Sequence, residues 1–134
     1  MNEESTREWI RKAESDLKIG KDELTTADPA TDAICFHMQQ CAEKYLKAFL
    51  VFNGREIRRT HIIEDLIKEC MKTDERFRSL ADTDAVLLTP YAVEIRYPAD
   101  APPPSLEMTK QAIRAAETVK QFVLGILEEK GFSP

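Results

Sequence analysis

The stretch from residue 29 to residue 53 places the tightest constraint on how this chain can fold. It follows Asp28 and begins with Pro29, a natural helix start, and it runs into Asn53-Gly54, a natural helix stop. Apolar side chains cover more of its circumference than is typical of a helix with one solvent-exposed side. They are Ile34, Phe36, Met38, Cys41, Ala42, Tyr45, Leu46, Ala48, Phe49, Leu50 and Phe52. Such a helix either lies at the centre of a bundle or buries a second face against a partner.

Further helices are indicated by apolar residues that recur at three- and four-residue steps. They are expected over residues 5–24, 62–70, 84–97 and 105–130. Pro90 should kink or restart the helix that contains it, and residues 73–84 should form one helical turn plus a loop. The sequence therefore predicts an all-α fold, an antiparallel up-and-down helical bundle of four long helices plus a short extra helix. At 134 residues it should form a single domain over residues 1–134.

Several residues are typical of helix ends. Ser5, with Glu8 three residues later, has the spacing of a capping box. Thr60 and Ser105 are expected to cap the third and the last helix. Gly131 is expected to end the last helix, since glycine readily adopts the left-handed conformation found there.

Charge and composition exclude several classes of protein. The formal net charge is −5 and the sequence pI is about 5.1, so any nucleic-acid contact would need a local basic patch. No stretch approaches the roughly 20 apolar residues of a membrane span, and no signal segment is evident at the N-terminus, which predicts a cytoplasmic protein. Cys35, Cys41 and Cys70 form no CxxC motif. They are expected to be buried thiols, and neither a metal site nor a cofactor is expected.

Three motifs occur in a fixed order along the chain. Residues 36–48 read FHMQQCAEKYLKA, Thr60-His61 follows with Leu66 a turn later, and residues 96–98 read RYP. This series resembles the HEPN family, the higher eukaryotes and prokaryotes nucleotide-binding domain. The resemblance extends from Trp9 to about Leu127.

The resemblance implies an up-and-down helical bundle that is usually dimeric. Stand-alone prokaryotic HEPN proteins often accompany a minimal nucleotidyltransferase as a two-component or toxin–antitoxin pair. Many members are metal-independent ribonucleases, whose signature is an arginine followed by four to six residues and a histidine. Arg96 occupies the arginine position, but residues 101–103 are Ala-Pro-Pro and no histidine follows His61. The chain thus departs from the nuclease pattern at the general acid or base.

Arg96 and Tyr97 are therefore interpreted as binding residues. The guanidinium of Arg96 matches a phosphate, and the alternative is a charge that satisfies the last carbonyls of a helix. Tyr97 could stack on a base, and the alternative is a packed tyrosine. His37, on the central helix, is either a core or interface histidine or a catalytic group.

A local anion site is also predicted in the connection before the third helix. Arg55, Arg58 and Arg59 lie close in sequence to His61, which is expected at a helix N-terminus, where anions bind. The alternative is a solvated loop. On the helix over residues 29–53, Gln39, Gln40, Glu43 and Lys44 are expected to form a polar strip, with Glu43 and Lys47 as an ion pair.

Three functions fit these observations. The first is a non-catalytic nucleotide- or RNA-binding HEPN module that partners a minimal nucleotidyltransferase in a toxin–antitoxin-like system. The second is a ribonuclease with a displaced histidine, His37 or His61, acting with Arg96. The third is an assembly scaffold without a ligand. A homodimer is expected, because the helix over residues 29–53 is apolar on more sides than one small bundle can cover.

Overall fold

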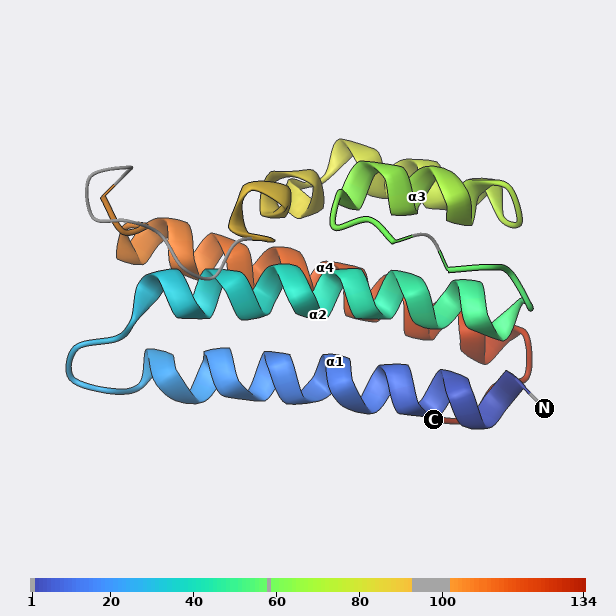
Figure 1. The fold of residues 1–134 in the computed structure, drawn as a ribbon, viewed down its shortest axis with the longest axis horizontal. Coiled ribbons are helices and arrows are strands. Elements are labelled where there is room, and N and C mark those ends of the chain that lie inside the picture. The colour runs from blue at the N-terminus through green and yellow to red at the C-terminus, as the bar shows by residue number, and fades with distance from the viewer. Residues whose placement is uncertain (1, 58, 93–101) are drawn as a thin grey trace.

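Helices form the regular structure of this protein in a computed structural model that describes residues 2–57, 59–92 and 102–134 (Figure 1). The predicted all-α class is confirmed. In chain order the elements are α1 (Asn2–Leu24), α2 (Thr31–Phe52), α3 (Ile63–Met71), two 3₁₀ helices η1 (Glu75–Asp82) and η2 (Asp84–Ala92), and α4 (Leu106–Glu129).

The elements are arranged around α2 (Figure 1). Helix α1 runs antiparallel to it along one side, and α3, η1 and η2 lie along the opposite side. The chain returns through η1 and η2, so that α4 runs in the same direction as α2 and packs against it. The two ends of the chain meet at one end of the bundle, where the Arg7 guanidinium donates to the Ser133 carbonyl at 2.9 Å.

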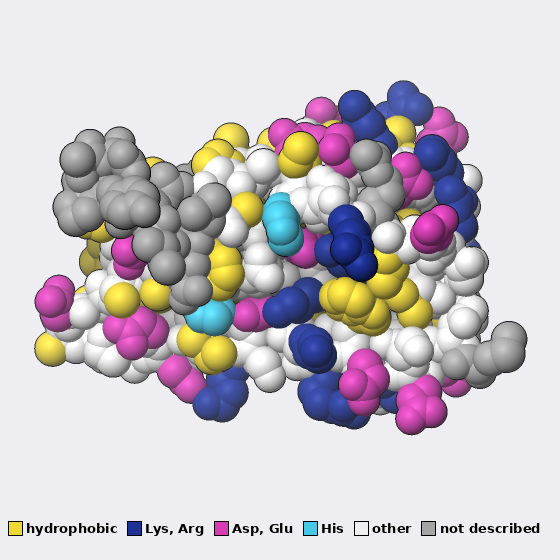
Figure 2. All heavy atoms as spheres, in the orientation of Figure 1, with side chains coloured by type: hydrophobic (Ala, Val, Ile, Leu, Met, Phe, Trp, Pro, Cys, Tyr) yellow, Lys and Arg dark blue, Asp and Glu magenta, His cyan; other side chains and the backbone are white. Residues whose placement is uncertain are grey.

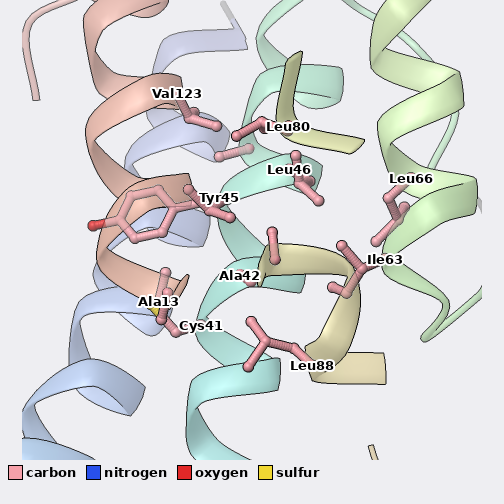
Figure 3. Close-up of a cluster of buried hydrophobic side chains, with 14 of the residues drawn as sticks. Ala13, Cys41, Ala42, Tyr45, Leu46, Ile63, Leu66, Leu80, Leu88 and Val123 are labelled. Atoms are coloured by element: carbon pink, nitrogen blue, oxygen red, sulfur yellow. The ribbon is translucent and has the colours of Figure 1, made fainter. Parts of the chain in front are cut away.

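The core confirms that α2 is the central helix. Ten of its apolar residues are at most 1% exposed, namely Ile34, Cys35, Met38, Cys41, Ala42, Tyr45, Leu46, Ala48, Phe49 and Leu50. They pack against side chains from the surrounding elements, including Ala13 of α1, Ile63 and Leu66 of α3, Leu88 of η2 and Val123 of α4 (Figure 3). One chain therefore covers α2, and the argument for a dimer from uncovered apolar surface no longer applies.

The segment predicted as a long helix over residues 84–97 differs from that prediction. Its described part is the 3₁₀ helix η2, with Pro90 inside it, and residues 93–97 lie outside the described residues. Proline has no N–H to donate and clashes with the preceding α-helical turn, so an α-helix is disfavoured here. Ala85 and Leu88 still reach the core. The part of the bundle that is described thus has three long α-helices, where four were predicted.

The segment 73–84 is also more ordered than predicted. Instead of one turn and a loop, it forms the eight-residue 3₁₀ helix η1. Asp74 caps this helix, because its carboxylate accepts the Arg76 N–H at 3.0 Å. Phe77 and Leu80 fix η1 to the core, with 0% and 1% of their surface exposed.

The helix-end predictions are partly confirmed. Ser105 caps α4 by accepting the Met108 N–H at 3.1 Å, and Gly131 ends it with φ +86°. Ser5 is not an N-cap, since α1 already begins at Asn2. Thr60 is not an N-cap either, because α3 begins at Ile63, whose N–H donates to the Thr89 hydroxyl oxygen at 3.1 Å.

Candidate functional site

A buried carboxylate of α1 connects two side chains of α2. Asp16 has only 9% of its side chain exposed and accepts hydrogen bonds from His37 and Lys44. The Nδ1 atom of His37 lies 2.7 Å from Oδ1, and the Lys44 Nζ lies 2.5 Å from Oδ2. Since an ionised carboxylate can only accept, the His37 Nδ1 carries the proton. Asp16 therefore fixes the tautomer and the orientation of this imidazole.

A second carboxylate, on α2 itself, is held in the same manner. The side chain of Glu43 is 5% exposed and accepts hydrogen bonds from three residues. The Lys47 Nζ donates at 2.7 Å, the His61 Nδ1 at 2.9 Å and the Gln39 Nε2 at 3.1 Å. His61 is 67% exposed, so this carboxylate anchors a histidine whose ring faces solvent.

Gln40 joins the two groups into one network. Its Nε2 donates to the Gln39 Oε1 at 2.7 Å, and Gln39 also donates to the His61 carbonyl at 2.9 Å. We call the whole set the α2 seam. It comprises Asp16, His37, Gln39, Gln40, Glu43, Lys44, Lys47 and His61. Figure 2 shows both histidines of the chain on one face of the molecule, with acidic and basic side chains between them.

The charges of the α2 seam balance when its histidines are neutral. Two carboxylates, Asp16 and Glu43, face two ammonium groups, Lys44 and Lys47. Each histidine uses Nδ1 for its carboxylate, and no described residue bonds its Nε2. A protonated imidazole is a donor that suits a phosphate oxygen. The two Nε2 atoms and the two ammonium groups are therefore the atoms through which the α2 seam could contact an anion.

Glu43 has a shifted pKa of mixed origin. Burial alone would raise the pKa of its carboxyl group, but hydrogen bonds from Lys47, His61 and Gln39 outweigh burial and hold it below the ordinary value of 4.5. A carboxyl group with a lowered pKa stabilises the fold fully above its unfolded-state pKa. That contribution is lost as the pH falls through the folded-state pKa.

Replacing Glu43 with glutamine should therefore reduce stability at pH 7 and flatten its pH dependence. In the unmodified protein the urea midpoint should fall as the pH drops below about 4.5, and this acid loss should be smaller in Glu43→Gln. Urea unfolding from pH 7 to pH 3, followed by circular dichroism, measures both effects. Glu4→Gln is the matched control at an exposed position. Equal acid slopes in all three proteins would show that the Glu43 network contributes nothing to stability.

The other predicted site residues are not part of the α2 seam or lie outside the described residues. Arg58, Arg96 and Tyr97 are outside the described residues. The Arg55 guanidinium donates to the Thr73 hydroxyl at 3.2 Å and lies 3.8 Å from the Glu69 carboxylate.

Arg55 and Arg59 do line one shallow hollow, but Glu56 and Glu69 line it too. The negative charges of these two glutamates offset the positive charges there. The structure thus brings together part of the predicted anion site, while the side chain of His61 is bonded to Glu43 of the α2 seam.

Sequence reasoning identified most of the α2 seam and missed Asp16. The polar strip of α2 and the Glu43–Lys47 pair are confirmed. Asp16 lies three residues after Ala13 and four before Gly20, on the apolar stripe of α1. A charged residue in a buried stripe signals a partner, because burying an unpaired charge is very unfavourable.

Other kinds of site find no support in the described part of the chain. No group of three or more His, Cys, Asp or Glu side chains there is placed to hold a metal ion. The three cysteines are buried and form no disulfide. Burial raises the pKa of the Cys41 and Cys70 thiols far above the ordinary value of 9.0, which makes them poor nucleophiles. The described helices include none with the length and apolarity of a membrane span.

Fold and site together define a helical-bundle protein with a charged polar network on its central helix. Comparison of the sequence with models of known protein families identifies the family, because the HEPN domain model matches residues 6–129. The chain therefore belongs to the HEPN domain family.

One curated relative is "Putative toxin MJ1304" of Methanocaldococcus jannaschii, 38% identical over 60 residues. The match covers 45% of this chain and 38% of the relative, so well under half of that protein is matched. No solved structure gives a significant match.

Proposed function

We propose that this protein is a HEPN module that binds single-stranded RNA or a nucleotide through the α2 seam. The observation that carries the proposal is the pair of histidines, each oriented by a buried carboxylate and each with Nε2 directed away from that carboxylate. Lys44 and Lys47 lie in the same network. Phosphate oxygens are ligands that such cationic donors recognise.

Trp9 supports single-stranded RNA as the ligand. Its half-buried ring lies next to the α2 seam, with the Lys47 Nζ 5.9 Å from the ring centroid. Proteins that bind single strands combine cationic groups along the backbone with aromatic rings on which bases stack. Trp9 supplies such a ring, and Lys47, whose side chain is 9% exposed and bonded to Glu43, fixes the position of the ring beside the α2 seam. Arg96 and Tyr97 remain part of the proposal on the strength of the family resemblance.

The family and its relative suggest the biological setting. We propose a toxin-like component of a two-component system, paired with a minimal nucleotidyltransferase and assembled as a homodimer of single-domain chains. The name of the relative supports the toxin-like role. The dimer and the partner rest on the HEPN resemblance. Light scattering at micromolar concentration would test the dimer, and a monomer would contradict it.

A ribonuclease is the second candidate, because a histidine bonded to a buried carboxylate is a competent general base. The spacing favours binding instead. His37 and Glu43, which anchors His61, are six residues apart on α2, or about 9 Å along the helix axis. Proton transfer to and from one phosphate needs both groups within hydrogen-bond reach of it. The two histidines are better placed to contact separate phosphates of one strand.

Lys44 provides the direct test of RNA binding. Replacing Lys44 with methionine should weaken binding of a fluorescein-labelled single-stranded RNA by roughly 10- to 100-fold, since a hydrogen bond to a charged group contributes about 1.5–3 kcal/mol. It should also reduce the slope of log K against log salt by about 0.7, the value for one phosphate contact on a single strand. Fluorescence anisotropy measures both quantities. Lys110→Met, on the exposed surface of α4, is the matched control.

Two further arms of this titration separate the α2 seam from the arginine loop. A double His37→Gln, His61→Gln variant should bind the RNA more weakly than the unmodified protein. Arg58→Glu with Arg59→Glu should have less effect than Lys44→Met. Unchanged affinity and salt slope in Lys44→Met would contradict binding at the α2 seam, and a large loss in the arginine variant would place the site in the loop.

A further inference from the structure

A shallow hollow lies at the end of the bundle where α1 turns into α2. It has a volume of about 410 Å³. Ile19, Ala33 and Ile34 form its apolar floor, Asp22 and Glu23 line one part of it, and His37 lines another. Ile19 is 48% exposed although it is a large apolar residue.

The hollow is continuous with the α2 seam through His37. That side chain lines the hollow and is also bonded to Asp16, which holds Lys44. The ring of Phe36 packs edge-on against His37 with 5.3 Å between centroids, which further fixes the imidazole. A ligand could therefore contact the apolar floor and the cationic groups of the α2 seam at the same time.

We propose that this hollow holds the base of a bound nucleotide, with its phosphate at His37 and Lys44. The proposal rests on the proposed function and adds where the base lies. Charge sets the direction of the ligand, because the carboxylates of Asp22 and Glu23 in the hollow repel a phosphate, whereas the Lys44 ammonium, which shares Asp16 with His37, attracts it. The apolar floor suits the face of a base, which gains from leaving water.

The carboxylates also indicate which bases fit. The Glu23 Oε2 is held by the Ala30 N–H at 3.0 Å and the Thr26 hydroxyl at 3.3 Å, and the Asp22 Oδ2 accepts from Lys18 at 2.7 Å. No described residue bonds the second oxygen of either carboxylate. These oxygens can accept a hydrogen bond from an exocyclic amine. Adenine, cytosine and guanine carry such an amine and uracil does not, so the hollow should prefer these three bases over uracil.

Comparing ligands with and without a base tests the proposal. AMP should bind about tenfold more tightly than ribose 5-phosphate by isothermal titration calorimetry, and CMP more tightly than UMP. Ala33→Phe, which fills the hollow, should remove the advantage of AMP and leave the affinity for ribose 5-phosphate unchanged. Ala81→Phe, at an exposed position of η1 away from the hollow, is the matched control. Ile19→Trp, at a half-exposed position, is a second filling variant should Ala33→Phe not fold.

The outcomes separate this inference from the proposed function. Equal affinities for AMP and ribose 5-phosphate would overturn the base site. A base preference that both filling variants retain would overturn it as well. If ribose 5-phosphate and RNA still bind and depend on Lys44, the proposed function stands without the hollow. If neither they nor AMP bind the unmodified protein, the proposed function and the base site are both wrong.

Discussion

Replacing Phe49 with alanine should lower the free energy of unfolding by about 3–5 kcal/mol, the usual cost of truncating a fully buried phenylalanine. Phe49 is 0% exposed, and its ring centroid lies 4.4 Å from that of Phe77 in η1. Phe77 in turn contacts Phe122 of α4, with 5.0 Å between centroids. One truncation would therefore disturb the contact of the central helix with both neighbours. We expect the melting temperature to fall by roughly 10 °C or more.

Phe52→Ala is the matched control for this experiment. Phe52 is three residues further along α2, but it is only partly buried and packs edge-on against Phe132 near the C-terminus. Its truncation should cost clearly less, because less apolar surface leaves water on folding. Urea unfolding of the two variants at pH 7 measures the difference. Similar losses in both would contradict the central position of α2 around Phe49.

The central position of α2 was predictable from the sequence, because a helix that is buried on all sides has apolar residues around most of its circumference. A helix with apolar residues around most of its circumference cannot lie at a surface. The 3₁₀ form of residues 84–92 was harder to predict. Leu87, Leu88 and Tyr91 have an apolar pattern that fits either kind of helix. Pro90 predicts an interruption of the helix, but a proline alone does not determine whether the helix kinks, restarts or changes to the 3₁₀ form.

The candidate site was predictable only within single helices. The i, i+4 spacing of Glu43 and Lys47 is enough to predict their ion pair, which the structure confirms. His61 reaches Glu43 from a connection 18 residues away, and Asp16 reaches Lys44 from another helix. Contacts of that kind depend on how α1 and the connection pack on α2. No spacing of residues within one helix encodes these contacts. The complete α2 seam could therefore be identified only from the three-dimensional structure.

The absence of efficient RNA cleavage is the prediction with the largest kinetic consequence. Metal-independent cleavage needs one group to take the 2′-hydroxyl proton and another to protonate the leaving oxygen. Arginine stays protonated and can only stabilise phosphate charge, so Arg96 cannot replace the missing family histidine. His37 and His61 are held by different carboxylates on the α2 seam. Without a pair acting on one phosphate, the 100- to 10,000-fold typical of general acid–base catalysis should be missing.

Incubating the protein with end-labelled single-stranded RNA in EDTA tests whether the protein cleaves RNA without a metal ion. We expect cleavage no faster than in buffer alone, under conditions in which anisotropy shows the RNA to be bound. His37→Ala, His61→Ala and Arg96→Ala should then change binding without revealing any turnover. Robust cleavage that disappears in both His37→Ala and Arg96→Ala would overturn the binding-only function. It would show that the displaced histidine supplies the missing acid or base, because a contaminating nuclease would not respond to either substitution.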